Sequence, residues 1–142
     1  MKKKSEAQIF LERVEKLDAL IENKQIEQRQ WEELAYRITA NMEGERVQST
    51  GSKSKMADAV DMCMAISDEI SDTIDKLIAD KQKVIRVIEQ VYSPTHYKIL
   101  HLRYIQYMEL NDIAEYLDKE YSAITTAHGR ALKQVQAILN RT

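Results

Sequence analysis

Apolar residues recur along the first 92 residues at alternating steps of three and four, the spacing of helices that pack along a seam. The first row predicts a helix that begins after Ser5 and ends near Met42. Ser5 and Gln8 stand at the two positions of a capping box, in which Ser5 caps the helix and Gln8 reaches back. Lys24 and Gln28 interrupt the row at its middle. The row consists of Phe10, Val14, Leu17, Ile21, Lys24, Gln28, Trp31, Ala35, Ile38 and Met42.

A second apolar row predicts another long helix, from Ser54 to about Tyr92. Its members recur every seventh residue, and two further stripes widen the apolar face. The first row is Met56, Cys63, Ile70, Leu77, Val84 and Val91, and the stripes are Val60, Ile74, Ile88 and Ala59, Ile66, Val87. Two helices of matched length joined by one connection predict an antiparallel hairpin, with Trp31 at least partly buried near its middle.

The connection between these helices, Glu43–Lys53, contains two glycines and several small polar residues, which predict an exposed loop. The run Thr50–Lys53 superficially suggests a phosphate-binding loop. That motif requires a preceding strand and a different spacing, so we interpret the segment as a plain loop.

The last third of the chain changes to shorter apolar groups. Pro94 ends the second long helix because proline disfavours helical backbone in the residue before it, and Thr95 is placed to cap the next helix. Three short helices follow, with the last two separated by a polar turn at 118–120. Their apolar positions are Ile99, Leu100, Leu102, Tyr104 and Ile105, then Leu110, Ile113, Ala114 and Leu117, then Ile124, Ala127, Ala131, Leu132 and Val135. The pattern therefore predicts an all-α protein with a helical hairpin over 1–92 and a helix-turn-helix domain over 93–142.

Charge separates the two regions further. Charged residues make up 31% of the chain, with 3 Gly and 1 Pro, a composition typical of long helices. The net charge of -2 hides an uneven distribution, because no acidic residue follows Glu120 while Arg130, Lys133 and Arg141 do. Positive charge thus gathers where a helix-turn-helix would meet phosphate.

The spacing of the last third resembles a known DNA reader. The run Leu100–Ile105, then Asp112–Ala114, Leu117, Ile124 and Arg130–Leu132 resembles the promoter-reading helix-turn-helix of sigma factors, called region 4. The run Tyr121–Leu132 is also similar to small prophage proteins of Gram-positive bacteria, some of them transcriptional regulators of the RinA and ArpU kind. Glu109 and Glu120 stand where such readers usually have Ser or Thr, and Gly129 lies within the third helix.

The resemblance implies a sequence-specific, double-stranded DNA-binding regulator of phage or prophage genes. It implies an activator that acts near promoters and contacts RNA polymerase, in the cytoplasm of a bacterial host. The residues expected to meet DNA are Tyr121, Ser122, Thr125, Thr126, Arg130 and Lys133. Thr125 is the expected base contact and Arg130 and Lys133 the expected phosphate contacts. Arg103 either braces the fold or touches phosphate, and His128 either packs or touches DNA.

No catalytic set, cofactor site or metal site is predicted, so an enzyme is not expected. His96 and His101 are five apart, off the spacing that places two ligands on one helix face. The lone Cys63 lies on an apolar stripe and is expected to be a core thiol. No apolar stretch approaches the length of a membrane span, so a soluble, intracellular protein is expected. Lys2–Lys4 are interpreted as a disordered start, with nucleic-acid binding as the alternative.

A homo-oligomer, with a dimer favoured, is expected from the wide face of the second long helix. One hairpin partner covers about half of three stripes, which leaves Val60, Ile74 and Ile88 exposed, and exposed apolar patches mark interfaces. Two alternatives remain open. The chain could be a phage DNA-packaging protein like a small terminase subunit, or an interaction protein whose helix-turn-helix no longer binds DNA.

Overall fold

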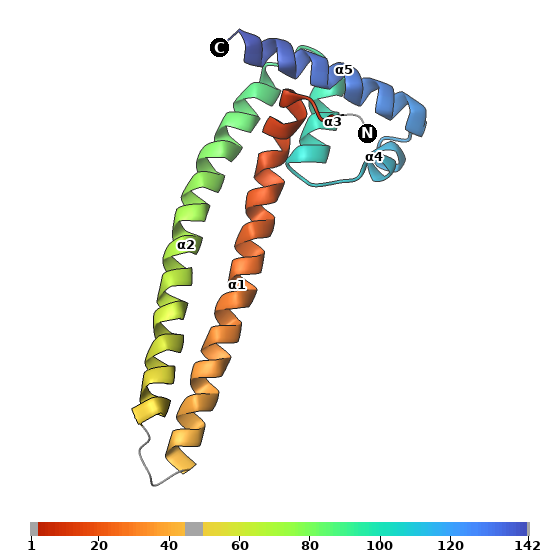
Figure 1. Ribbon diagram of the computed structural model, residues 1–142. Coiled ribbons are helices and arrows are strands. Elements are labelled where there is room, and N and C mark those ends of the chain that lie inside the picture. Colours follow the sequence, from red (N-terminus) through yellow and green to blue (C-terminus); the bar gives the residue numbers. More distant parts are fainter. Residues whose placement is uncertain (1–2, 45–49, 142) are drawn as a thin grey trace. The chain divides into compact units, whose positions relative to one another are not determined.

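The computed structural model describes residues 3–44 and 50–141, and these residues form five α-helices and no strand (Figure 1). The helices are α1 (Glu6–Gly44), α2 (Thr50–Glu89), α3 (Pro94–Tyr104), α4 (Leu110–Tyr116) and α5 (Tyr121–Asn140). The predicted all-α fold with an N-terminal hairpin is confirmed. The chain divides into two compact units, one made of Met1–Leu17 with Leu77–Thr142 and one made of Asp18–Lys76.

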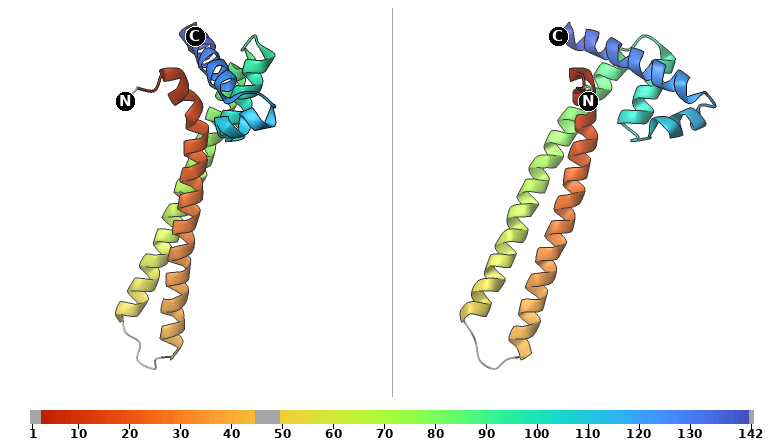
Figure 2. Two further views of the ribbon diagram at one scale, coloured as in Figure 1. Left: turned by 90° about the vertical axis from the view of Figure 1, so that its right-hand side faces the viewer. Right: turned by 45° about the vertical axis from the view of Figure 1, so that its right-hand side comes forward.

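The unit Asp18–Lys76 is an antiparallel pair formed by the later part of α1 and the earlier part of α2 (Figure 2). Ile21 is buried and Trp31 is half-buried, as the first apolar row predicts, and Ile66 of the additional stripe Ala59, Ile66 and Val87 is also buried. The two polar residues that interrupt the seam both find partners across it. Lys24 forms an ion pair with Glu69, and the Gln28 side-chain amide donates to the Cys63 carbonyl oxygen at 3.2 Å. Both interruptions therefore remain part of the helix pairing.

The connection between α1 and α2 is shorter than the predicted loop Glu43–Lys53. The first helix continues to Gly44 and the second begins at Thr50, so helix takes up both ends of the expected loop. Residues 45–49 lie outside the described residues. Turn-forming residues such as Gly51 are tolerated in the first turn of a helix, where few backbone hydrogen bonds depend on them, and this explains why composition misplaced the boundary.

In the other unit, one apolar cluster joins residues from four helices. Its buried members are Ala7, Leu11, Val14, Val84, Ile88, Val91, Leu100, Tyr104, Ala131, Val135 and Ile138. The predicted exposure of Ile88 is wrong, since only 1% of this residue is exposed. Ile88 joins residues of α1, α3 and α5 in this cluster, and the periodicity of α2 alone does not reveal these partners. Val60 and Ile74 do stay exposed as predicted.

The caps of the helices match the sequence in part. Ser5 Oγ accepts from the Gln8 amide N–H at 3.2 Å, but the Gln8 side chain donates to Glu12 at 3.1 Å instead of reaching back. Ser93, and not Thr95, is the N-cap of α3, because its hydroxyl accepts from the His96 amide and Pro94 occupies the first helical position. Only half of the predicted capping box is therefore present.

Candidate nucleic-acid interface

The connection between α4 and α5 is a tight turn closed by backbone hydrogen bonds. Leu117 is the C-cap of α4, and the Lys119 amide donates to the Ala114 carbonyl at 2.9 Å. Asp118 adopts a φ of 54°, a left-handed conformation that aspartate tolerates better than most residues. Glu120 is the N-cap of α5 and makes no side-chain capping bond. The short helix α4 and the longer α5, joined by this turn, form the predicted helix-turn-helix arrangement.

A second apolar cluster lies beneath this turn and fixes the two helices against α3. Its buried members are Ile99, Leu102, Ile113, Ala114 and Ile124. The residue Ile124 anchors the first turns of α5, while Ala131 and Val135 anchor its later turns in the larger cluster. The predicted inward stripe of α5 is thus confirmed at these positions, and the helix is held along most of its length.

The opposite face of α5 is open to solvent. Ser122, Thr126, Arg130 and Lys133 are exposed, and their spacing of three and four places them on one side of the helix. Tyr121 is 51% exposed beside them. The sequence of α5 contains no Asp or Glu. The outward face of this helix therefore carries hydroxyl and cationic groups without an opposing carboxylate on the same helix.

Thr125 lies at the margin of that face. It is half-buried, and its hydroxyl donates to the Ser122 carbonyl at 3.0 Å. Thr126, by contrast, is exposed on the centre of the face. Both hydroxyls retain lone pairs that can accept hydrogen bonds, so the structure leaves both threonines accessible and ranks Thr126 as the more outward of the two.

Arg103 braces the connection between α3 and α4. Its guanidinium donates to the Met108 carbonyl at 3.3 Å and lies 5.7 Å from the Tyr104 ring centre. In that connection Tyr107 is half-buried with a φ of 62°. Of the two roles weighed for Arg103, the structure therefore supports the bracing role directly.

Tyr116, at the end of α4, is 64% exposed. The residue ends α4 on the side away from its buried pair Ile113 and Ala114, and its ring lies 6.0 Å from the Lys98 amine. A seven-residue helix has room for few inward positions, and the smaller residues occupy them.

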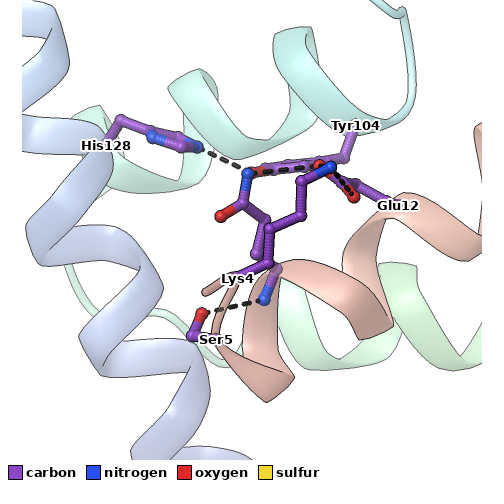
Figure 3. A network of polar contacts seen from close by, with 6 residues as sticks. Lys4, Ser5, Glu12, Tyr104 and His128 are labelled. Atoms are coloured by element: carbon purple, nitrogen blue, oxygen red, sulfur yellow. Dashed lines mark hydrogen bonds and ion pairs between the residues drawn. The ribbon is translucent and has the colours of Figure 1, made fainter. Parts of the chain in front are cut away.

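A polar contact ties α5 to α3 inside the protein (Figure 3). The Tyr104 hydroxyl and His128 Nε2 are 2.7 Å apart, and the two rings stack with centres separated by 5.7 Å. Burial raises the pKa of Tyr104, so its hydroxyl keeps its proton and donates. Burial first, and then the nearby Arg103 charge, lowers the pKa of His128, which makes Nε2 a neutral acceptor. His128 is thus a packing residue and not part of the outward face.

The start of α1 adds further polar contacts to the same region. The Lys4 amine pairs with Glu12 at 2.9 Å, as Figure 3 shows. The Ala7 amide donates to Gln136 Oε1 at 3.1 Å, so a side chain of α5 satisfies a free donor in the first turn of α1. Sequence spacing gave no sign of the Ala7–Gln136 contact, because these two residues are 129 positions apart.

The part of the chain that the structure describes contains no metal-binding cluster and no membrane-spanning helix. No three His, Cys, Asp or Glu side chains there are grouped so that they could hold a metal ion. Among the described helices, none has both the length and the apolar character needed to cross a membrane.

No family model, no curated protein and no solved structure matches this chain. The function of the protein is therefore inferred from the helix-turn-helix and from the outward face of α5.

Proposed function

We propose that this protein is a sequence-specific, double-stranded DNA-binding regulator of transcription. The observation that carries the proposal is the outward face of α5. Ser122, Thr126, Arg130 and Lys133 share one exposed side of the second helix of a tight helix-turn-helix, and α5 has no acidic residue. In DNA-binding helix-turn-helix domains, this helix lies in the major groove with its first turns against base edges.

The order of side chains along α5 suits that placement. Hydroxyl groups come first, at Ser122, Thr125 and Thr126, and they can bond base edges or touch a thymine methyl group. Cationic groups follow at Arg130 and Lys133, where phosphates of the flanking backbone are the natural partners. Few charges imply modest affinity for a single reader, which favours binding assisted by a second copy or by RNA polymerase.

The biological setting follows from the resemblance of Tyr121–Leu132 to prophage regulators. On that basis the regulated genes are phage or prophage genes, the protein acts in the bacterial cytoplasm, and activation near a promoter through RNA polymerase is the mechanism that we propose.

The proposal is tested by measuring binding to random-sequence duplex DNA as a function of salt. Lys133→Ala should weaken binding and flatten the slope of log K against log salt by about one unit, because one phosphate contact is lost. Lys55→Ala removes an equally exposed lysine from α2 and serves as the matched control. If both variants behave like the parent, or if the parent does not bind DNA at low salt, the outward face of α5 is not a DNA interface.

A further inference from the structure

The unit Asp18–Lys76 presents on α2 a row of six exposed residues, four of them apolar. The row follows steps of three and four through Ala57, Val60, Met64, Ser67, Ser71 and Ile74. All six residues are exposed, with 43% of Val60, 63% of Met64 and 37% of Ile74 accessible. The residues buried in the hairpin, Ala59, Ile66 and Thr73, occupy a different heptad position of the same helix. This second row therefore has the spacing of a coiled-coil seam, and the residues that the structure describes leave it exposed.

A line of carboxylates borders the row. Asp61, Asp68 and Asp75 recur every seventh residue, and all three are exposed. None of them forms an ion pair with any residue that the structure describes, whereas Glu69 on the same helix is paired with Lys24. In coiled coils, charged residues at such flanking positions select the partner helix by its charge.

We propose that this face of α2 binds a basic amphipathic α-helix of another protein. An apolar row at heptad spacing fits the apolar stripe of a partner helix. The acidic border calls for Lys or Arg on the flank of that helix. The row from Ala57 to Ile74 is about 26 Å long at 1.5 Å per residue, enough for between two and three heptads of partner helix.

Two details of the row favour such a partner over a second copy of this chain. Pairing α2 with itself would place the aspartates of two chains along one interface, and like charges at neighbouring positions destabilise helix pairs. The small side chains of Ser67 and Ser71 also leave room at the middle of the row for a bulkier apolar side chain of the partner. The inference concerns a different surface from α5 and does not depend on DNA binding.

The test uses a labelled synthetic helix of four heptads, with Leu at the seam positions and Lys at the flanking positions, and the full chain. A matched peptide carries Glu in place of each Lys. Fluorescence anisotropy should show that the Lys peptide binds and the Glu peptide does not. Binding should weaken as ionic strength rises from ~0.05 to ~0.3 M, because exposed charges are screened.

Two variants locate the binding. The triple change Asp61→Asn, Asp68→Asn and Asp75→Asn should lower the affinity for the Lys peptide by about tenfold, as expected for three exposed ion pairs. Met64→Gln should weaken it too, without altering thermal unfolding, because this side chain is mostly outside the hairpin. Glu27→Gln, Glu33→Gln and Asp58→Asn together remove three exposed acids off the row and should leave binding unchanged.

Three results would overturn the proposal. Equal binding of both peptides would reduce the row to a nonspecific apolar patch. Unchanged binding by the Asp61, Asp68 and Asp75 triple variant would remove the role of the acidic border. A chain that self-associates through Val60 and Met64 and thereby excludes the peptide would make a second copy the occupant.

Discussion

The contact between the Tyr104 hydroxyl and His128 Nε2 joins α3 to α5, and its contribution to the free energy of unfolding should depend on pH. The pKa of His128 is lowered in the folded state from a model-peptide value of 6.5. Above that pH both the folded and unfolded forms are neutral, so the contact contributes fully. Below it, the unfolded chain takes up a proton that the folded chain resists, and stability falls.

We therefore expect the free energy of unfolding to decrease between about pH 7 and pH 5, by at most about 1.4 kcal/mol per pH unit for this one group. The variant His128→Gln should show a shallower pH dependence in urea titrations. His101→Gln, which changes a half-buried histidine bonded to Gln106, is the control and should keep the dependence of the parent. Superimposable pH profiles for the parent and His128→Gln would contradict this assignment.

Gly129 is a second residue with a definite expectation. A Cβ atom built at this position meets nothing within 4 Å. The packing of the chain therefore does not require glycine in the middle of α5, and Gly129→Ala should stabilise the protein by about 1 kcal/mol through helix propensity. Ala137→Gly, at an exposed site of the same helix, should lose a similar amount. A less stable Gly129→Ala variant would contradict this expectation, because it would mean that the backbone of α5 requires glycine at this position.

At the scale of elements, Leu77 tests the seam of α2. This residue is half-buried and packs against the larger apolar cluster. Replacing it by Asp places a charge against that cluster, and we expect a loss of about 3 kcal/mol. The neighbouring Ile78 is 52% exposed, so Ile78→Asp is a closely matched control with little expected effect. Equal melting temperatures for the parent and Leu77→Asp would mean that the heptad row is wrongly assigned.

The spacing of apolar residues was sufficient to predict inward positions and helix boundaries where the packing partners follow a regular repeat. It placed Ile21 of the first apolar row inward and the start of α5 at Tyr121, as the structure does. It failed where the partner came from elsewhere in the chain. Ile88 is buried in a cluster that also draws residues from α1, α3 and α5, and the His128–Tyr104 contact depends on how α3 and α5 cross. Neither arrangement is encoded in the spacing of one helix.

In the candidate site too, some features could be predicted from the sequence and others could not. The exposed positions of α5 follow from helical register, so Ser122, Thr126 and Lys133 could be assigned from the sequence. The bracing by Arg103 could not be assigned, because it depends on a hydrogen bond to the Met108 carbonyl in the connection between α3 and α4.

At the scale of the whole molecule, the dimer remains a prediction. The burial of Ile88 removes one of the three residues on which it was based, and the other two, Val60 and Ile74, are assigned above to a different partner, so a dimer requires another surface. Light scattering at micromolar concentration should give a mass of twice 16.5 kDa. Val60→Gln should leave that mass unchanged, because the row on α2 is assigned to a different partner. A monomer at every concentration would contradict the dimer and favour docking on RNA polymerase, and a ring of many chains would favour DNA packaging.

The most direct test of the central claim, that the outward face of α5 reads DNA sequence, is to sequence the fragments that the purified protein retains from a randomised duplex pool. We predict one enriched motif for the parent and for Lys55→Ala, and an altered preference within that motif for Thr125→Ala, since each lost base contact removes about 1–3 kcal/mol of discrimination. A retained pool without any enriched motif, or an identical motif and affinity in a variant that lacks both Thr125 and Thr126 hydroxyls, would contradict base reading by this face.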